Sequence, residues 1–78
     1  MKTTRYFEAM RARTDRAAIR DEWVIAVIER PEKESVQADG RIRRWARISE
    51  AEGRVLRVVL LADGETVHNA FFDRRVTL

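Results

Sequence analysis

The first apolar residues of the chain are spaced as on one side of a helix. Tyr6, Phe7 and Met10 lie within about one helical turn of each other, and the two threonines before them are suited to cap its start. We therefore predict a helix over residues 5–13.

A six-residue apolar run with charged flanks predicts a second helix, over residues 21–30. Acidic residues in its first turn and Arg30 in its last turn suit the dipole of a helix, and Pro31 follows where a helix should stop. The apolar run alone would also fit a buried strand, and one longer helix over residues 15–30 remains an alternative.

Beyond Pro31 the apolar residues take the spacing of strands separated by glycine-containing turns at residues 39–40, 50–53 and 63–64. The predicted strands span residues 34–38, 41–49, 54–62 and 65–72. Short turns between consecutive strands indicate an antiparallel meander. The predicted fold class is α+β, with two N-terminal helices packed on one face of a four-stranded sheet, in a single domain over residues 1–78.

The register of the last predicted hairpin depends on its turn. A two-residue turn at Asp63-Gly64 opposes Ala62 to Glu65 and fixes every later pair. The face toward the helices then carries Leu56, Val58, Leu60, Val67 and Phe71. The far face carries Arg57 and His68 among Val55, Val59, Leu61, Thr66, Ala70 and Phe72.

The strand over residues 41–49 has two possible registers, because the turn after it does not fix one. In the first register the core gains apolar residues and the far face gains arginines, with Ile42, Ala46 and Ile48 turned inward and Arg43, Trp45 and Arg47 turned outward. In the second register Trp45 is buried and Arg44 points outward. We prefer the first because it buries no row of arginines, although a buried tryptophan is the competing expectation.

Arginine supplies fourteen of the sixteen basic residues, and the net charge is only +3. Guanidinium groups bind phosphate or carboxylate through paired hydrogen bonds and stack on rings, so the bias favours such ligands. The codon bias of a GC-rich genome would produce the same excess without any function, and both explanations stay open.

The chain has 78 residues, no cysteine and no apolar run long enough to span a bilayer. Disulfides and cysteine-based zinc sites are therefore excluded, and we expect a soluble, cytoplasmic domain. A core of this size gives only marginal stability, so we also expect a homodimer, with the apolar part of the far face covered by a second copy or a partner protein.

Three motifs in the C-terminal half suggest a family. Residues 40–48 hold a strand that contains Gly, Arg-Arg and Trp in this order, residues 53–59 hold a Gly-Arg-Val-hydrophobic strand, and the last strand ends in the Phe-Phe-Asp-Arg of residues 71–74. In this order they resemble the small bacterial toxin BrnT and related uncharacterised domains of the RelE/ParE superfamily.

The resemblance implies a RelE/ParE-like fold and, as in several members, an RNA-cleaving toxin neutralised by a cognate antitoxin. Other members act on gyrase or have no known activity. The motif residues that carry over are Arg43, Arg44, Trp45, Arg54 and Arg74. The chain departs from the family pattern at two places. Phe72 stands where BrnT-like chains usually have a small polar residue, and the C-terminal tyrosine common in RelE-type nucleases is missing. These departures weaken the inference of nuclease activity more than that of the fold.

Cleavage of RNA without a metal needs a general base, a general acid and cations at the phosphate. His68, the single histidine, is the candidate catalytic residue because its ordinary pKa suits proton transfer near neutrality. Arg43, Arg57 and Arg74 would bind the phosphate, and Trp45 would stack on a base. A partly exposed strand histidine without a catalytic role is the simpler explanation of His68.

Two functions are therefore in competition. The first is a toxin-like RNA-binding or ribonuclease module, with RNA and a cognate antitoxin as partners. The second is a non-catalytic protein-interaction or homodimerisation domain. They differ in whether the sheet arginines gather around His68 in a concave surface or lie flat beneath a partner. The sequence has no glycine-rich phosphate loop and no metal-ligand cluster, so no cofactor is predicted.

Overall fold

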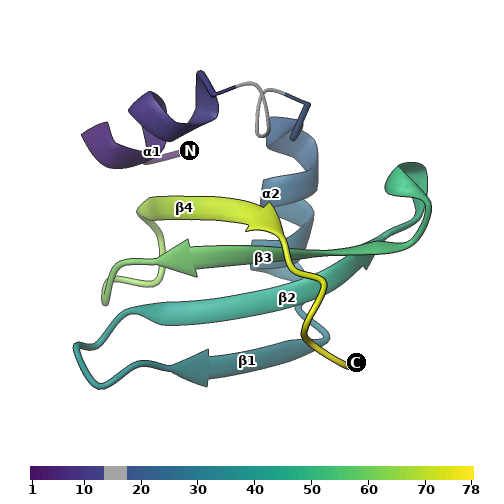
Figure 1. Cartoon of the computed structure of the whole chain (residues 1–78). Coiled ribbons are helices and arrows are strands. Elements are labelled where there is room, and N and C mark those ends of the chain that lie inside the picture. Colours follow the sequence, from purple (N-terminus) through teal and green to yellow (C-terminus); the bar gives the residue numbers. More distant parts are fainter. Residues whose placement is uncertain (14–17) are drawn as a thin grey trace.

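A four-stranded antiparallel sheet and two helices make up the fold, as Figure 1 shows. The computed structural model describes residues 1–13 and 18–78. Helix α1 spans Arg5–Arg11 and α2 spans Asp21–Glu29. The strands are β1 (Lys33–Val36), β2 (Ile42–Ile48), β3 (Arg54–Leu60) and β4 (Val67–Phe72), in the spatial order β1-β2-β3-β4, and a 3₁₀ helix, η1 (Ser49–Ala51), joins β2 to β3.

The predicted α+β class, the two helices and the meander are confirmed. The backbone of Arg20 is extended at φ −82° and ψ 145°, so α2 begins at Asp21. The alternative of one continuous helix over residues 15–30 is therefore wrong, because residues 18–20 are not helical. Residues 15–17 lie outside the described part of the chain.

The N-terminal segment pairs with β4, which the sequence did not predict. Thr3 forms a parallel bridge with Val67, whose N–H donates to the carbonyl of Lys2 at 2.8 Å. The Thr4 N–H donates to the carbonyl of Val67 at 3.0 Å, and the Thr4 hydroxyl accepts from the N–H of Phe7 at 3.1 Å. Thr4 is thus the N-cap that starts α1 beside the edge of β4.

The hydrophobic core lies between α2 and the sheet. Val24 and Val27 of α2 are fully buried, and α2 lies against β2 and β3. The buried cluster consists of Phe7, Val24, Val27, Ala46, Ile48, Ala51, Leu56, Val58, Leu60, Val67 and Ala70. We call the sheet face opposite α2 the open face; it is the face turned to the viewer in Figure 1.

The preferred register of β2 is confirmed. Ala46 and Ile48 belong to the core cluster and Ile42 packs against it, while Trp45 lies opposite Arg57. Arg44 is on the helix side, where its Nη1 donates to the Ile28 carbonyl at 3.0 Å. Arg44 therefore caps the C-terminal end of α2 and is not part of the open face.

The predicted register of the last hairpin holds at the strand pair next to the turn and is wrong beyond that pair. Leu60 lies opposite Val67, but a β-bulge between Val59 and Leu60 shifts the later pairs, so that Leu56 faces Phe72 and Arg57 faces Phe71. The residues of β4 beyond the bulge therefore lie on the opposite face of the sheet from the one predicted. Phe72 packs against the core, Ala70 is buried in it, and Phe71 joins the open face with Arg57 and His68.

The turn differs from the predicted one but does not cause this shift, because Leu60 still pairs with Val67. The Leu61 N–H donates to the Thr66 carbonyl at 2.9 Å, so the loop has four residues instead of two, with the same register. The Asp63 carboxylate accepts from the backbone N–H groups of Glu65 and Thr66 and from the Thr66 hydroxyl. These bonds lower the pKa of Asp63 to about 2, and the bond from the Thr66 hydroxyl contributes most to the shift.

Candidate functional site

A groove of about 380 Å³ opens on the open face where β3, β4 and α1 meet. Its lining mixes aromatic, amide and cationic side chains: Tyr6, Gln37, Arg41, Arg57, Val59, His68, Asn69 and Phe71. The lining contains two arginines and one histidine but no carboxylate. The groove is therefore suited to an anionic ligand with a flat apolar part.

Arg57 occupies the centre of this surface, in the middle of β3. Its side chain is 22% exposed, and its guanidinium carbon lies 5.5 Å from the ring centre of Trp45 and 5.2 Å from that of Phe71. Burial lowers the pKa of Arg57, Arg43 lowers it further, and Asp73 opposes this. The positive charge of Arg57 is thus under-compensated, so an added anion would stabilise it.

Trp45, predicted as a stacking platform, is only 5% exposed. Lys33 lies 5.3 Å and Arg43 5.7 Å from the centre of its ring. The indole Nε1–H donates to Asp73 Oδ2 at 3.0 Å. Trp45 is therefore both outward-facing, as predicted, and buried, and a base can stack on it only if these side chains move.

His68 lies at the wall of the groove next to α1. Its Nδ1 is 3.1 Å from the Thr4 hydroxyl oxygen, and its ring stacks on Tyr6 with centres 4.8 Å apart and planes at 21°. Burial lowers the pKa of His68, Arg41 lowers it further, and Asp39 raises it. The imidazole is therefore neutral near pH 7, as a general base would be.

The structure brings together most of the predicted site residues. Arg43 and Arg57 both lie over Trp45, with Arg43 Nε donating to the Ser35 hydroxyl at 2.9 Å. Arg57 and His68 share the groove. Arg74 is different: it is exposed in the C-terminal tail (residues 73–78), and the groove is lined without it.

Tyr6 and Arg41 are groove residues that the sequence analysis missed. Tyr6 is 48% exposed and comes from α1, which reaches β4 only through the unpredicted pairing of Thr3 with Val67. No local sequence signal reveals that contact. Arg41 did have a signal, because it alternates with Arg43 and Trp45 and so falls on the same face of the strand.

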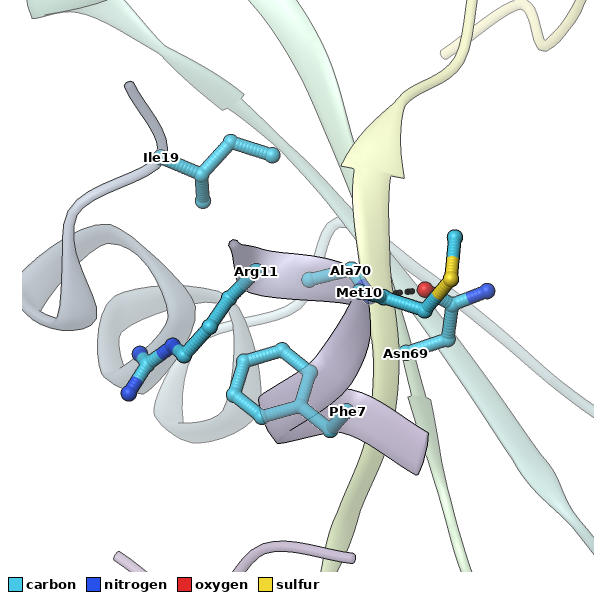
Figure 2. Close-up of a pocket in the computed structure, with 6 residues that line it drawn as sticks. All are labelled: Phe7, Met10, Arg11, Ile19, Asn69 and Ala70. Carbon is cyan, nitrogen blue, oxygen red and sulfur yellow. Dashed lines mark hydrogen bonds between the residues drawn. The ribbon is translucent and has the colours of Figure 1, made fainter. Parts of the chain in front are cut away.

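A second, much smaller hollow lies between α1 and β4. Figure 2 shows its lining, with Phe7, Met10 and Arg11 of α1 near Ile19 and near Asn69 and Ala70 of β4. Its volume of about 10 Å³ is that of a single water molecule. It is a small gap where α1 packs against the sheet, and it is too small for a nucleotide.

Over residues 1–13 and 18–78, no group of three histidine, cysteine or acidic side chains is placed to hold a metal ion. Neither helix in this part of the chain has the length and apolar character needed to cross a bilayer.

Comparisons of the chain with protein-family models, with curated proteins and with solved structures found no significant match. The likeness of its motifs to BrnT and the RelE/ParE superfamily therefore stays a prediction from the sequence.

Proposed function

We propose that this protein binds single-stranded RNA in the groove on its open face. The observation that carries the proposal is the lining of the groove, which combines Arg41, Arg57 and aromatic rings without a carboxylate. RNA-binding sheets use this combination, since arginines contact phosphates and aromatic rings stack on unpaired bases.

The groove differs in charge from the other large hollow of the molecule. That hollow, of about 390 Å³, lies between the N-terminal segment and α2, and its lining includes Glu29 and Glu65 beside Lys2. Its two carboxylates would repel a phosphate, whereas the lining of the groove has none. Size alone does not distinguish the two hollows, and charge favours the groove.

In the proposed complex each part of the groove has a role. Arg41 and Arg57 contact neighbouring phosphates. The ring of Tyr6, stacked on His68, stacks with its other face on a base in place of the buried Trp45. Single strands are favoured over duplexes because only unpaired bases offer their faces for stacking.

Binding is better supported than cleavage. Metal-free cleavage needs both a base and an acid, and His68 is the one groove residue whose ordinary pKa suits either role near neutrality. A toxin of the RelE/ParE kind, neutralised by an antitoxin, remains the biological setting that we propose for such a surface. A neighbouring reading frame with an antitoxin-like pattern would support it.

The competing protein-interaction hypothesis has lost part of its basis. It rested on Val59, Leu61 and Phe72 as apolar surface on the far face. Phe72 instead packs against the core, and Val59 is buried. A homodimer stays a prediction, with less apolar surface to support it.

The test is a titration of a fluorescently labelled oligouridylate, followed by anisotropy at several salt concentrations. Arg41→Gln should weaken binding about tenfold at low salt and reduce the salt slope by about one unit, because one phosphate contact is lost. The matched control is Arg30→Gln, at the far end of α2, which removes the same charge outside the groove. Equal effects of both variants would mean that only net charge matters, and absence of binding would refute the proposal.

A further inference from the structure

Asp73 places a carboxylate on the open face beside the groove. Its side chain is only 11% exposed. Oδ2 accepts from the indole N–H of Trp45 at 3.0 Å and lies 3.8 Å from Nη1 of Arg57. Oδ1 accepts the backbone N–H of Arg75 at 2.9 Å.

These contacts hold the C-terminal tail across the sheet. The N–H of Asp73 donates to the Val55 carbonyl at 2.9 Å, and Figure 1 shows the tail passing in front of β3 and β2. Arg57 lines the groove and also pairs with Asp73. The groove and the place occupied by Asp73 are therefore neighbours that share one guanidinium.

The surroundings of Asp73 carry more positive charge than one carboxylate neutralises. Lys33, Arg43 and Arg57 all lie within 6 Å of the Trp45 ring. At 3.8 Å the pair of Arg57 and Asp73 is an ion pair without a direct hydrogen bond. A phosphate offers more acceptor oxygens than a carboxylate and uses the same donors.

We propose that Trp45, Arg43 and Arg57 form a second phosphate subsite, which the Asp73 carboxylate occupies in the unbound protein and an RNA phosphate occupies in the complex. This rests on the proposed RNA binding. When the phosphate replaces Asp73, the tail leaves the sheet and the Trp45 ring becomes available to a base. RNA then binds along a track that runs from the groove to Trp45.

The exchange has a measurable consequence for affinity. A ligand that must displace an internal group binds more weakly than it would bind the open state. Its apparent affinity is the affinity of the open state multiplied by the fraction of molecules that are open. Asp73→Asn keeps one acceptor oxygen, enough for either the Trp45 N–H or the Arg75 N–H, and loses the charge that opposes a phosphate. It should bind oligouridylate about fivefold more tightly at low salt. The matched control is Glu52→Gln, an exposed residue of the turn after η1.

Trp45 itself reports the exchange. In a Trp23→Phe background Trp45 is the single tryptophan, and the phenyl ring keeps apolar packing beside Phe72. Saturating oligouridylate should quench Trp45 emission through base stacking, and thermal unfolding of each variant confirms that it is folded. The subsite is refuted if RNA binds while Trp45 emission is unchanged and Asp73→Asn binds no more tightly than Glu52→Gln. Failure of RNA binding as a whole would instead appear as no anisotropy change in any variant.

Discussion

Trp45 and Arg57 lie directly opposite each other on β2 and β3, and the Arg57 guanidinium sits 5.5 Å from the centre of the indole ring. This pair shows how the open face, opposite α2, is covered. Cationic side chains and the tail cover an aromatic ring that no helix reaches, so the arginines of the open face serve both packing and ligand binding.

Trp45→Ala should therefore destabilise the protein as a core substitution does, by about 3 kcal/mol, because a buried aromatic side chain is lost. Urea denaturation monitored by circular dichroism measures the change. Tyr6→Ala is the comparison, and it should cost much less, since about half of Tyr6 is exposed. A cost below about 1 kcal/mol for Trp45→Ala, in the range of surface substitutions, would show that Trp45 is an exposed platform in solution.

Thr4 links helix capping to the groove. Thr4→Ala removes both the acceptor for the Phe7 N–H and the contact with His68, and should cost about 1 kcal/mol in the free energy of unfolding. Thr4→Ser keeps the hydroxyl and should cost less. The alanine variant should also weaken RNA binding, because the stacked pair of Tyr6 and His68 loses its anchor. Equal stability of the two variants would contradict the role of the hydroxyl.

His68 predicts a dependence of RNA binding on pH. Its pKa lies below the ordinary value because of burial and Arg41, with Asp39 opposing, so the ring is neutral at pH 7 and gains charge on acidification. RNA affinity should rise between about pH 7.5 and 5.5, since an imidazolium in the groove attracts phosphate. Anisotropy titrations at each pH measure this, and His68→Gln should flatten the profile. An unchanged profile in the variant would place the titrating group elsewhere.

The lowered pKa of His68 also predicts that the protein loses stability on acidification. A histidine whose pKa is lowered by folding binds protons more readily in the unfolded chain, so its contribution to stability is lost as pH falls below the unfolded pKa. The urea midpoint of the wild-type protein should fall more on acidification than that of His68→Gln. A parallel fall in both proteins would remove His68 as the cause.

How far the sequence predicted the fold depends on which interactions are local. The α2 helix and the inward set of β2 follow from charge placement and alternation, which are properties of neighbouring residues. Phe71 and Phe72 were assigned to the wrong faces because β4 has one extra residue, His68, between the partners of Leu60 and Val59. Nothing in the alternation of β4 reveals an extra residue.

The candidate site was predicted in part for the same reason. Arg57 and Arg43 share the open face by alternation, which the sequence shows. The burial of Trp45 depends on Asp73, 28 positions away, and the place of Tyr6 depends on the pairing of the N-terminal segment with β4. Such long-range contacts have no local pattern, so Trp45 was assigned the stacking role that the exposure of Tyr6 now favours.

The most direct test of RNA binding at the open face is a titration of isotope-labelled protein with oligouridylate, followed by amide chemical shifts. The account predicts that Arg41, Arg57 and His68 shift progressively, while the buried Val24 and Val27 of α2 do not. Shifts confined to the hollow lined by Glu29 and Glu65, or no shifts at saturating RNA, would contradict it.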